Sequence, residues 1–521
     1  MTELLTPMPV GRKPRRDDIF ECRVTGLRRR GGASARWGEF DVELRSGVPG
    51  ELLRCQVTKR RGGLVRARIL ELLEPSPRAL APACVHFADC GGCSFQDSAY
   101  DLQLEQLHAR LVDLFRPLLA KHDFPVAAVL GGEALGSPLF GYRNKMDYTF
   151  GAKRWIEAEL ESEVGTEGRP RDFALGLHAP GRHDKVLDVT TCHISFESGR
   201  PILSAARELG LELGLAPWDL VGHTGLLRHL VLREGVRTGE VLVYLVTSSQ
   251  EGVERIPEYA AQLVERCPQI TTLVHGVRDA ISSVAEGESD VVLHGQGHIR
   301  EVLGGVTFEV SARSFFQTNT NAAEGLFKVV AEEACVTQDE VVFDLYCGAG
   351  SIALLVAGSA REVWGFERVE PAVEDARRNA TAAGITNAHF VAGDVLETAS
   401  AEGLAKLGAP DADVVIVDPP RAGLHPGVVA FLIERAQAGS GQRLVYVSCN
   451  PKAAATDLEA LVAGGYRVLR ARPVDLFPHT PHLECVFTCE YVGVPDAPAS
   501  ADAECAGPDS DPDTDKEPSD G

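Results

Sequence analysis

The sequence predicts an α/β protein with a small, OB-like β-barrel first, a central mixed α+β domain next, and a Rossmann-like domain at the carboxyl end. Three observations predict this order. Residues 341–451 alternate short apolar runs with helical segments, as parallel sheets covered by helices do. Residues 19–73 alternate short β-rich runs with Gly and Pro turns, which is typical of small barrels. The segment between them mixes both patterns and contains a group of cysteines.

Length and composition are those of a globular protein. The 521 residues are enough for about three domains, with 44% hydrophobic and 24% charged residues. We place the domains at 12–75, 76–300 and 301–494, followed by an acidic tail at 495–521 with the composition of disorder. The chain has no uncharged apolar run of 18 residues and no signal-peptide pattern. We therefore expect a cytoplasmic monomer with no membrane partner and no obligate protein partner.

The basic residues are concentrated at the amino-terminal end. The net charge of −22 argues against a nucleic-acid partner, but Arg12 to Arg68 holds sixteen Lys or Arg against seven acids. Charges are screened beyond about 8 Å, so the local sign decides attraction. The predicted barrel at 12–75 is therefore a candidate RNA-binding module. The alternative is a basic surface that is only solvated.

Cys84, Cys90 and Cys93 follow C-x5-C-x2-C spacing around a Gly-Gly turn, and Cys192 is the next cysteine along the chain. Four thiolates suit tetrahedral zinc or an iron–sulfur cluster, and spacing alone does not choose between them. Unrelated buried thiols are the remaining interpretation.

Two further segments of the central region have simple patterns. A helix over 98–116 carries leucines on one face, and we expect it to pack on the carboxyl-terminal domain. Residues 141–150 interleave aromatic rings with Arg143 and Lys145, which suits contacts to RNA bases and phosphates. A plain strand with a polar outer face fits them equally well.

Polar residues end the successive strands of the carboxyl-terminal pattern. In a parallel sheet such residues face one crevice, where ligands bind. They are Asp344, Glu367, Asp394, Asp418 and Cys449. The turn Gly348-Ala-Gly350-Ser-Ile-Ala353 also fits a nicotinamide-dinucleotide fingerprint. The Asp-Pro-Pro motif at Asp418 and a strand-end thiol have no evident task in hydride transfer, which favours S-adenosylmethionine.

Cys449 ends the apolar run Leu444 to Val447 and precedes Pro451, which could open a helix. A thiol at that edge is expected to have a lowered pKa. The alternative is a small buried residue that closes a strand.

The carboxyl half resembles the RNA uracil-C5 methyltransferases, and 19–73 resembles the TRAM barrel found in RNA-modifying enzymes. The matching stretches are Phe315-Phe-Gln-Thr-Asn319, Asp344 to Gly350, Asp418-Pro-Pro-Arg421 to Leu424, Tyr446 to Pro451, and His482-Leu-Glu-Cys-Val486. The resemblance implies a class I methyltransferase fold for 301–494. It also implies a 4Fe-4S cluster, ahead of zinc, on Cys84, Cys90, Cys93 and Cys192.

The resemblance further implies roles for single residues. Cys449 corresponds to the nucleophile and Glu484 to the base that removes a proton; without the resemblance, Glu484 would be taken for a surface or ion-paired residue. The implied contacts to S-adenosylmethionine are Gln317, Tyr346, Gly348, Gly350, Ser351, Glu367, Asp394 and Asp418. Among these, Ser351 and Asp394 stand where related enzymes often carry Asn.

The implied chemistry needs these residue types. Carbon 5 of uracil is a poor nucleophile, and addition of a thiolate at carbon 6 makes carbon 5 reactive. A cytosine enzyme would place a cysteine in the motif after the fourth strand, where this chain has DPPR, and an adenine enzyme needs no thiol. We therefore expect methylation of a uridine in structured RNA, with 23S rRNA favoured over tRNA. An inactive RNA-binding protein and a nicotinamide-dependent oxidoreductase are the alternatives.

Overall fold

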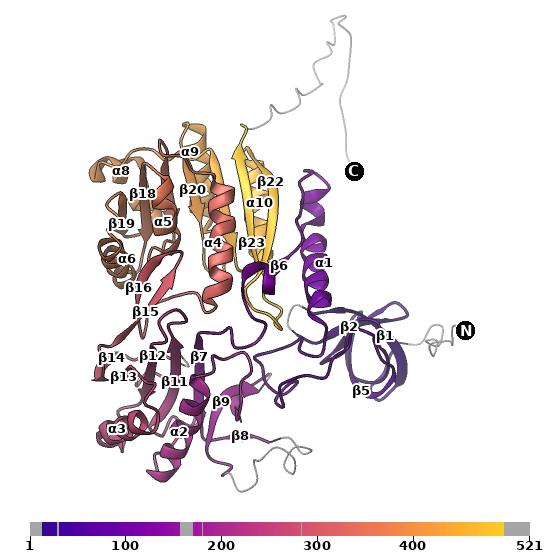
Figure 1. The fold of residues 1–521 in the computed structure, drawn as a ribbon. Helices are drawn as coiled ribbons and strands as arrows, with labels where there is room; N and C mark the ends of the chain where they lie inside the picture. Colours follow the sequence, from indigo (N-terminus) through magenta and orange to yellow (C-terminus); the bar gives the residue numbers. More distant parts are fainter. Residues whose placement is uncertain (1–12, 29–30, 157–169, 180, 283, 494–521) are drawn as a thin grey trace, which may run out of the picture.

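The computed structural model describes residues 13–28, 31–156, 170–179, 181–282 and 284–493. The predicted acidic tail and residues 157–169 lie outside the described residues. Figure 1 shows a barrel beside a central sheet, with a second large sheet above them. Within the described ranges, each helix is too short or too polar to cross a membrane.

The amino-terminal strands form a closed barrel in the order β1-β2-β3-β5-β4. They are β1 (Ile19–Leu27), β2 (Ala33–Trp37), β3 (Phe40–Leu44), β4 (Leu52–Arg61) and β5 (Leu64–Glu74). Alternate residues point inward, and the ring of Phe20 stacks on Trp37 at 4.2 Å in the barrel core. The predicted barrel is confirmed. It has one strand more than the apolar runs indicate, because β2 (ASARW) is short and rich in small residues.

The central region is built on an eight-stranded sheet of order β14-β13-β12-β11-β7-β9-β10-β8. Its strands are β7 (Lys145–Gly151), β8 (Arg154–Trp155), β9 (Ala174–Ala179), β10 (Arg182–Asp188), β11 (Leu227–Glu234), β12 (Val241–Thr247), β13 (Thr272–Val277) and β14 (Ser289–His294). Helices α2 (Gly199–Glu212) and α3 (Ile256–Arg266) bury one face, with a short helix, η2 (Val253–Arg255), before α3. The hairpin β15 (His298–Leu303) and β16 (Val306–Ser311) packs between the other face and the carboxyl-terminal sheet (Figure 1).

The carboxyl-terminal sheet has the order β19-β18-β17-β20-β21-β23-β22-β6. Its strands are β6 (Leu130–Gly131), β17 (Val341–Leu345), β18 (Glu362–Glu367), β19 (Ala388–Ala392), β20 (Val414–Val417), β21 (Arg443–Ser448), β22 (Tyr466–Asp475) and β23 (Glu484–Tyr491). The five strands from β19 to β21 are parallel, and β23 runs antiparallel to both of its neighbours. The expected α/β architecture of this region is confirmed.

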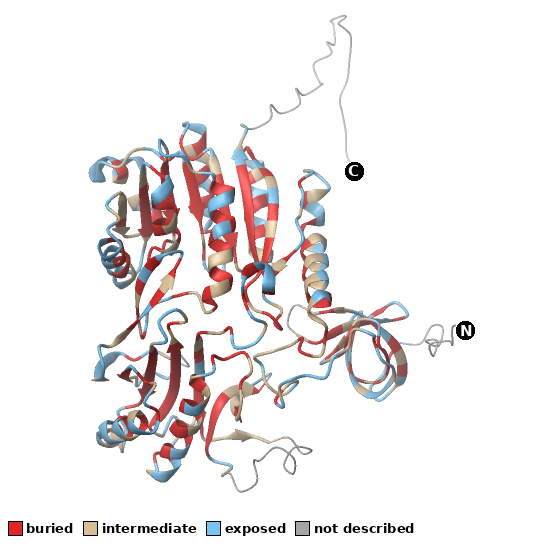
Figure 2. Cartoon of the chain, in the orientation of Figure 1, coloured by how far each residue is buried: buried red, intermediate tan, exposed pale blue. Residues whose placement is uncertain are grey.

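Helices bury both faces of this sheet. One face is covered by α4 (Thr320–Ala334), α5 (Ser351–Val356) and α6 (Glu370–Ala382), with the short η1 (Gly132–Leu135) and η3 (Ala357–Ser359) nearby. The other is covered by α1 (Tyr100–Leu119), α7 (Val395–Thr398), α8 (Ala401–Leu407), α9 (Pro426–Gln437) and α10 (Pro451–Ala463). Figure 2 shows the strands buried between these layers. Helix α1 precedes the central sheet in the sequence, but it lies between the barrel and the carboxyl-terminal sheet and joins the two (Figure 1).

The strand order reverses between β17 and β20, which makes this the switch point of the sheet. In doubly wound sheets the ligand crevice opens at the carboxyl ends of the strands at that point. The Gly-rich turn follows β17, and Asp418 follows β20.

Candidate active site

The Gly-rich turn after β17 exposes backbone to the crevice. Tyr346, Gly348 and Gly350 have positive φ angles of 67°, 54° and 83°. A Cβ on Gly350 would lie 2.9 Å from the ring of Phe390, so packing requires glycine there. A Cβ on Gly348 would meet nothing within 4 Å, so the backbone at Gly348 faces open space that a ligand can approach. Ser351 begins α5 directly after the turn.

Glu367 is held across this turn by two backbone hydrogen bonds. Its Oε2 accepts from the N–H of Gly348 at 3.2 Å, and its Oε1 accepts from the N–H of Val369 at 2.9 Å. Asp394 is exposed at the end of β19, and its side chain caps α7 by accepting from the N–H of Leu396 at 2.9 Å. Tyr346 is half-buried, and its pKa is raised by burial and then by the charge of Asp394.

Two further carboxyl groups lie at the carboxyl ends of β17 and β20. Asp344 is completely buried, and its Oδ2 accepts from the N–H of Ala353 at 3.0 Å. Its Oδ1 is buried without a partner among the described residues. Burial, followed by the charge of Asp418, raises the pKa of Asp344 well above its usual range, and desolvation raises the pKa of Asp418 to about 7. Acids perturbed in this way inside a crevice are typical of functional sites.

Cys449 and Glu484 lie at the ends of paired strands. β21 ends at Ser448, which is paired with Cys485 of the antiparallel β23, so the chain positions next in register are Cys449 and Glu484. Cys449 is half-buried and Glu484 is buried. Burial raises the pKa of Glu484 to about 8, with the charge of Asp418 adding to the effect. The structure thus brings together the thiol and the carboxylate that the sequence analysis singled out.

The expectation of a lowered pKa for Cys449 is wrong. The pKa of its thiol is raised to about 11, mainly by burial and then by the charges of Glu484 and Asp418. The charge of Arg421 lowers this pKa, but by less than either carboxylate raises it. α10 does begin at Pro451, as expected, but its amino terminus does not outweigh burial and two nearby carboxylates. In the absence of substrate, the thiol is therefore the stable form at neutral pH.

Arg421 is a site residue to which the sequence analysis gave no part in catalysis. It is exposed, and its charge lowers the pKa of both Cys449 and Glu484. Its carbonyl oxygen accepts a hydrogen bond of 2.7 Å from Nδ2 of Asn450, which joins the DPPR turn to the Cys449 loop. The available signal was its place directly after the Asp-Pro-Pro motif.

Gln317 lies on the loop between β16 and α4. The carbonyl of Gln317 accepts from Nδ2 of Asn144 at 3.0 Å, which ties the loop to the central region. Asn319 caps α4 by accepting from the N–H of Ala322 at 3.2 Å. Phe315 on the same loop is 72% exposed.

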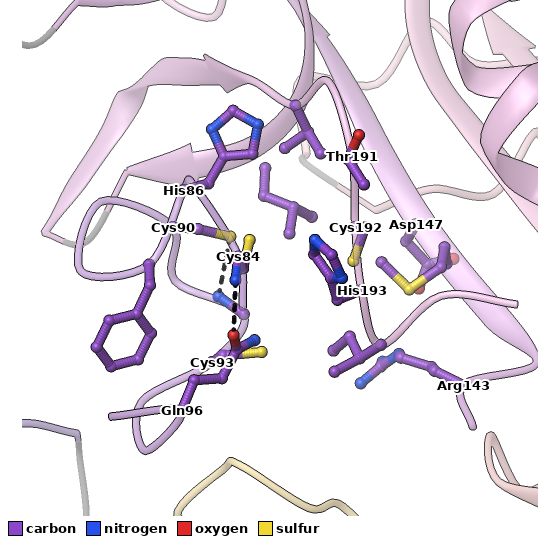
Figure 3. Close-up of a pocket in the computed structure, with 16 residues that line it drawn as sticks. Cys84, His86, Cys90, Cys93, Gln96, Arg143, Asp147, Thr191, Cys192 and His193 are labelled. Carbon is purple, nitrogen blue, oxygen red and sulfur yellow. Dashed lines mark hydrogen bonds between the residues drawn. The ribbon is translucent and has the colours of Figure 1, made fainter. Parts of the chain in front are cut away.

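The four predicted ligand cysteines line one cavity of about 280 Å³. Figure 3 shows Cys84, Cys90 and Cys93 on one loop and Cys192 on the opposite wall. Burial is the main cause that raises the pKa of each thiol, to about 12 for Cys90 and Cys93. The charge of Arg143, which also lines the cavity, lowers the pKa of Cys93 and of Cys192.

The metal site expected at these thiols is not borne out by the structure. In the part of the chain that the structure describes, no three His, Cys, Asp or Glu side chains form a group that could hold a metal ion. A zinc ion would require all four sulfurs about 2.3 Å from one centre.

The fold and the crevice define a class of protein. A doubly wound sheet with a Gly-rich turn and an acidic second-strand end suits an adenosine-containing donor, and an adjacent thiol and base suit covalent chemistry on a substrate ring. This combination is that of a methyltransferase acting on a nucleic-acid base. The family model described as tRNA (Uracil-5-)-methyltransferase matches residues 284–490.

Relatives that match nearly the whole chain are described as RNA methyltransferases. A protein of Porphyromonas gingivalis described as an uncharacterized RNA methyltransferase is 37% identical over 467 residues, covering 89% of this chain and 98% of that protein. One of Chlorobaculum tepidum with the same description is 35% identical, covering 91% and 96%. The chain therefore belongs to the tRNA (uracil-5-)-methyltransferase family and is an RNA methyltransferase that acts on uracil.

A solved structure shares the fold. It is the Pyrococcus abyssi tRNA (uracil-54, C5)-methyltransferase in complex with S-adenosyl-L-homocysteine, which is 27% identical with a TM-score of 0.67. The match covers 90% of this chain and 100% of that chain. The family resemblance seen in the sequence is thus confirmed at the level of the family.

Proposed function

We propose that this enzyme transfers a methyl group from S-adenosylmethionine to carbon 5 of a uridine in structured RNA, through a covalent bond between Cys449 and the base. The observation that carries the proposal is the pairing of β21 with β23, which sets Cys449 beside Glu484 at the crevice. A nucleophile and a base on neighbouring strands can act on adjacent carbons of one ring.

The residues of the crevice fit an adenosine-containing donor. The open space at Gly348 and the fixed carboxylate of Glu367 suit the ribose side of such a molecule. Gln317, Tyr346, Gly350, Ser351, Asp394 and Asp418 complete the proposed contacts. The Pyrococcus abyssi enzyme was solved with S-adenosyl-L-homocysteine, the demethylated form of this donor. The donor supplies the methyl group.

Cys449 and Glu484 divide the remaining work. Cys449 loses its proton to solvent, its Sγ bonds carbon 6 of the uracil, and the electrons of the carbon 5–carbon 6 double bond make carbon 5 the nucleophile that takes the methyl group. After methylation, Glu484 takes the proton from carbon 5, the electrons of that bond restore the carbon 5–carbon 6 double bond, and Sγ leaves carbon 6. A pKa of about 8 suits a base that must accept a proton near neutral pH. Arg421 favours the thiolate, because its charge lowers the pKa of Cys449.

We also propose a 4Fe-4S cluster on Cys84, Cys90, Cys93 and Cys192. The support is a set of four thiols, three half-buried and one buried, from two separate segments around one cavity. Zinc is the alternative occupant, since four thiolates also suit a tetrahedral ion, and the family resemblance is what favours the cluster. Arg143 at the cavity wall would offset part of the negative charge of a thiolate-bound cluster.

Three parts of the chain are proposed to hold the RNA: the basic barrel, the segment with Arg143 and Lys145, and the cysteine region. Lys145 pairs with Asp147 at 3.1 Å, and burial lowers the pKa of Lys145. We favour 23S rRNA as the substrate because members of the family with such a barrel and such cysteines include the rRNA enzymes. tRNA is the alternative, since the Pyrococcus abyssi enzyme is named for a tRNA position. Mapping 5-methyluridine in RNA from a deletion strain decides between them.

The mechanism is tested with RNA that contains 5-fluorouridine, in which the fluorine at carbon 5 cannot leave as a proton. Wild-type enzyme with S-adenosylmethionine should form an adduct that survives denaturing electrophoresis. Cys449→Ala should form none and lose at least about a thousand-fold in methylation rate. Cys335→Ala, which removes an exposed thiol outside the crevice, is the control. Methylation at the wild-type rate by Cys449→Ala would refute the proposed mechanism.

A further inference from the structure

The loop at 476–483 joins β22 to β23 and leads directly into Glu484. Its carbonyl oxygens are bound by four segments that are distant in sequence. Leu476 accepts from Asn319 Nδ2 at 2.8 Å, Pro478 from the Tyr142 hydroxyl at 3.1 Å, His479 from the N–H groups of Ser94 and Phe95 at 2.8 and 3.1 Å, and Pro481 from Arg110 at 3.0 Å. A connecting loop with this many contacts to distant segments has a fixed shape.

His479 is at the centre of these contacts. Its φ of 67° turns the backbone so that one carbonyl meets two N–H groups, and these follow Cys93 directly in sequence. The imidazole stacks on Phe140 with 4.5 Å between ring centroids. A non-glycine residue at positive φ is strained, and such strain persists only where the surroundings hold it.

Gln103 of α1 joins the loop and the cysteine segment. It is 1% exposed, and its Oε1 accepts from the N–H of His479 at 3.1 Å. Its Nε2 donates to the carbonyl groups of Phe95 and Ser98 at 2.9 and 2.8 Å. The side-chain amide of Gln103 therefore bonds to both His479 and the segment after Cys93, and it holds these two in contact.

Glu484 depends on this arrangement. Among the described residues its carboxylate has no hydrogen-bond partner, so the backbone of β23 and its entering loop determine where the carboxylate lies. Cys449 is placed differently, by the end of β21 and the start of α10. The loop therefore controls the position of the base and not that of the nucleophile.

We propose that the contact of His479 with the cysteine segment, locked by Gln103, positions Glu484 for removal of the carbon 5 proton. His479 and Gln103 are positioning residues, since neither lies at the reacting atoms. The inference rests on the proposed function of Glu484. A shift of the segment after Cys93 should therefore affect the last chemical step, in which the proton passes to Glu484 and the bond between Sγ and carbon 6 breaks.

The test separates adduct formation from adduct breakdown in the full-length protein. Gln103→Met keeps the volume of the side chain and removes its hydrogen bonds. The matched control is Gln106→Met on the same helix, because Gln106 accepts from the N–H of Leu27 in the barrel at 3.2 Å. Each variant is given RNA with ordinary uridine and labelled S-adenosylmethionine, and the methylated protein–RNA adduct is followed by denaturing electrophoresis.

We expect Gln103→Met to accumulate the methylated adduct, with breakdown slowed at least about ten-fold, since displacements of about 1 Å can cost about a hundred-fold in rate. Adduct formation with 5-fluorouridine RNA should stay within about two-fold of wild type, and Gln106→Met should resemble wild type in both steps. Tyr142→Phe, which removes only the hydroxyl bound to Pro478, is the milder second variant and should slow breakdown in the same direction.

The outcomes are distinct. If Gln103→Met and Tyr142→Phe both resolve the adduct at the wild-type rate, His479 and Gln103 do not position the base. If Gln103→Met does not fold, Tyr142→Phe decides alone. If the wild-type enzyme forms no adduct with 5-fluorouridine RNA, the proposed function itself fails and this inference fails with it.

Discussion

The carboxylate of Glu484 raises the pKa of the Cys449 thiol across the ends of two antiparallel strands, β21 and β23. Arg421 acts in the opposite direction on the same thiol. The reactivity of Cys449 is therefore determined by burial first, then by the two carboxylates of Glu484 and Asp418, against one cation. Each charge can be removed singly, and the two signs give opposite predictions.

Glu484→Gln should lower the pKa of Cys449, and Arg421→Ala should raise it, each by about one pH unit or less because burial remains. Near pH 11, where the thiol titrates, Glu484 with its pKa of about 8 is ionised, so its removal is felt in full. The measurement is the rate of Cys449 alkylation by iodoacetamide against pH, followed by mass spectrometry. Shifts of the same sign in both variants would contradict this account of the thiol.

Glu484 should also make folding stability depend on pH. Its pKa rises from about 4.3 in an unfolded chain to about 8 in the folded protein. The folded state thus binds the proton more tightly, and stability is lost as pH rises from about 4.3 through about 8. Glu484→Gln carries no such charge. Its melting temperature, relative to wild type, should therefore rise between pH 5 and pH 9; a constant difference over that range would show that Glu484 is ionised throughout.

The sequence was sufficient to predict where Cys449 lies on its strand, but not which charged groups surround its thiol. The run Leu444 to Val447 followed by a polar break is sufficient to place Cys449 at a strand end, because that pattern is local. The pKa of Cys449 depends instead on Glu484, which arrives on a strand paired only in the folded protein. The direction of its shift was therefore predicted wrongly.

The contacts of the 476–483 loop were equally out of reach of the sequence. Gln103 reads as an ordinary polar residue of an amphipathic helix, yet it is buried against His479, which lies far along the chain. The pairing of the short strand β6 with β22 was likewise not predictable from the sequence, because the two strands are far apart in the chain. Such contacts depend on which elements pack together in the folded protein, and they leave no periodic pattern in the sequence. The five parallel strands, by contrast, repeat one local pattern.

Glu367 should be essential for binding the methyl donor. Glu367→Ala loses hydrogen bonds from a charged group, which are worth about 1.5–3 kcal/mol each, so affinity for S-adenosylhomocysteine should fall about ten- to a hundred-fold. Isothermal titration calorimetry measures it. Glu370→Ala removes a carboxylate at the start of α6 that pairs with Arg377, and it should bind as wild type does. Equal losses in both variants would mean that general acidity, and not the position of Glu367, governs binding.

The cysteine cavity should hold iron. Protein purified without oxygen should contain about four irons and matching sulfide per chain. Cys90→Ser should lose them, because Cys90 is one of the four thiols of the cavity. Cys267→Ser changes a buried cysteine directly after α3 that does not line the cavity, and it should retain the metal. One zinc per chain with no iron would exclude the cluster and leave the tetrahedral alternative.

Packing of helix α1 should stabilise the carboxyl-terminal sheet. Phe115 is 1% exposed and packs on Phe487 of β23, with 5.0 Å between ring centroids. Phe115→Ala should therefore destabilise that sheet by about 3–5 kcal/mol, because it leaves a cavity between two buried elements. Arg116→Ala breaks only an exposed pair with Asp113 and should cost about 1 kcal/mol or less.

Urea unfolding followed by hydrogen exchange assigns the loss to a region. The prediction is that strands β21 and β23 lose protection together with α1 in Phe115→Ala, while the barrel keeps its own. Loss of protection confined to the barrel would mean that α1 is an extension of the barrel. The sheet bearing Cys449 and Glu484 would then be stable without the helix, and α1 would serve only to join the barrel to it.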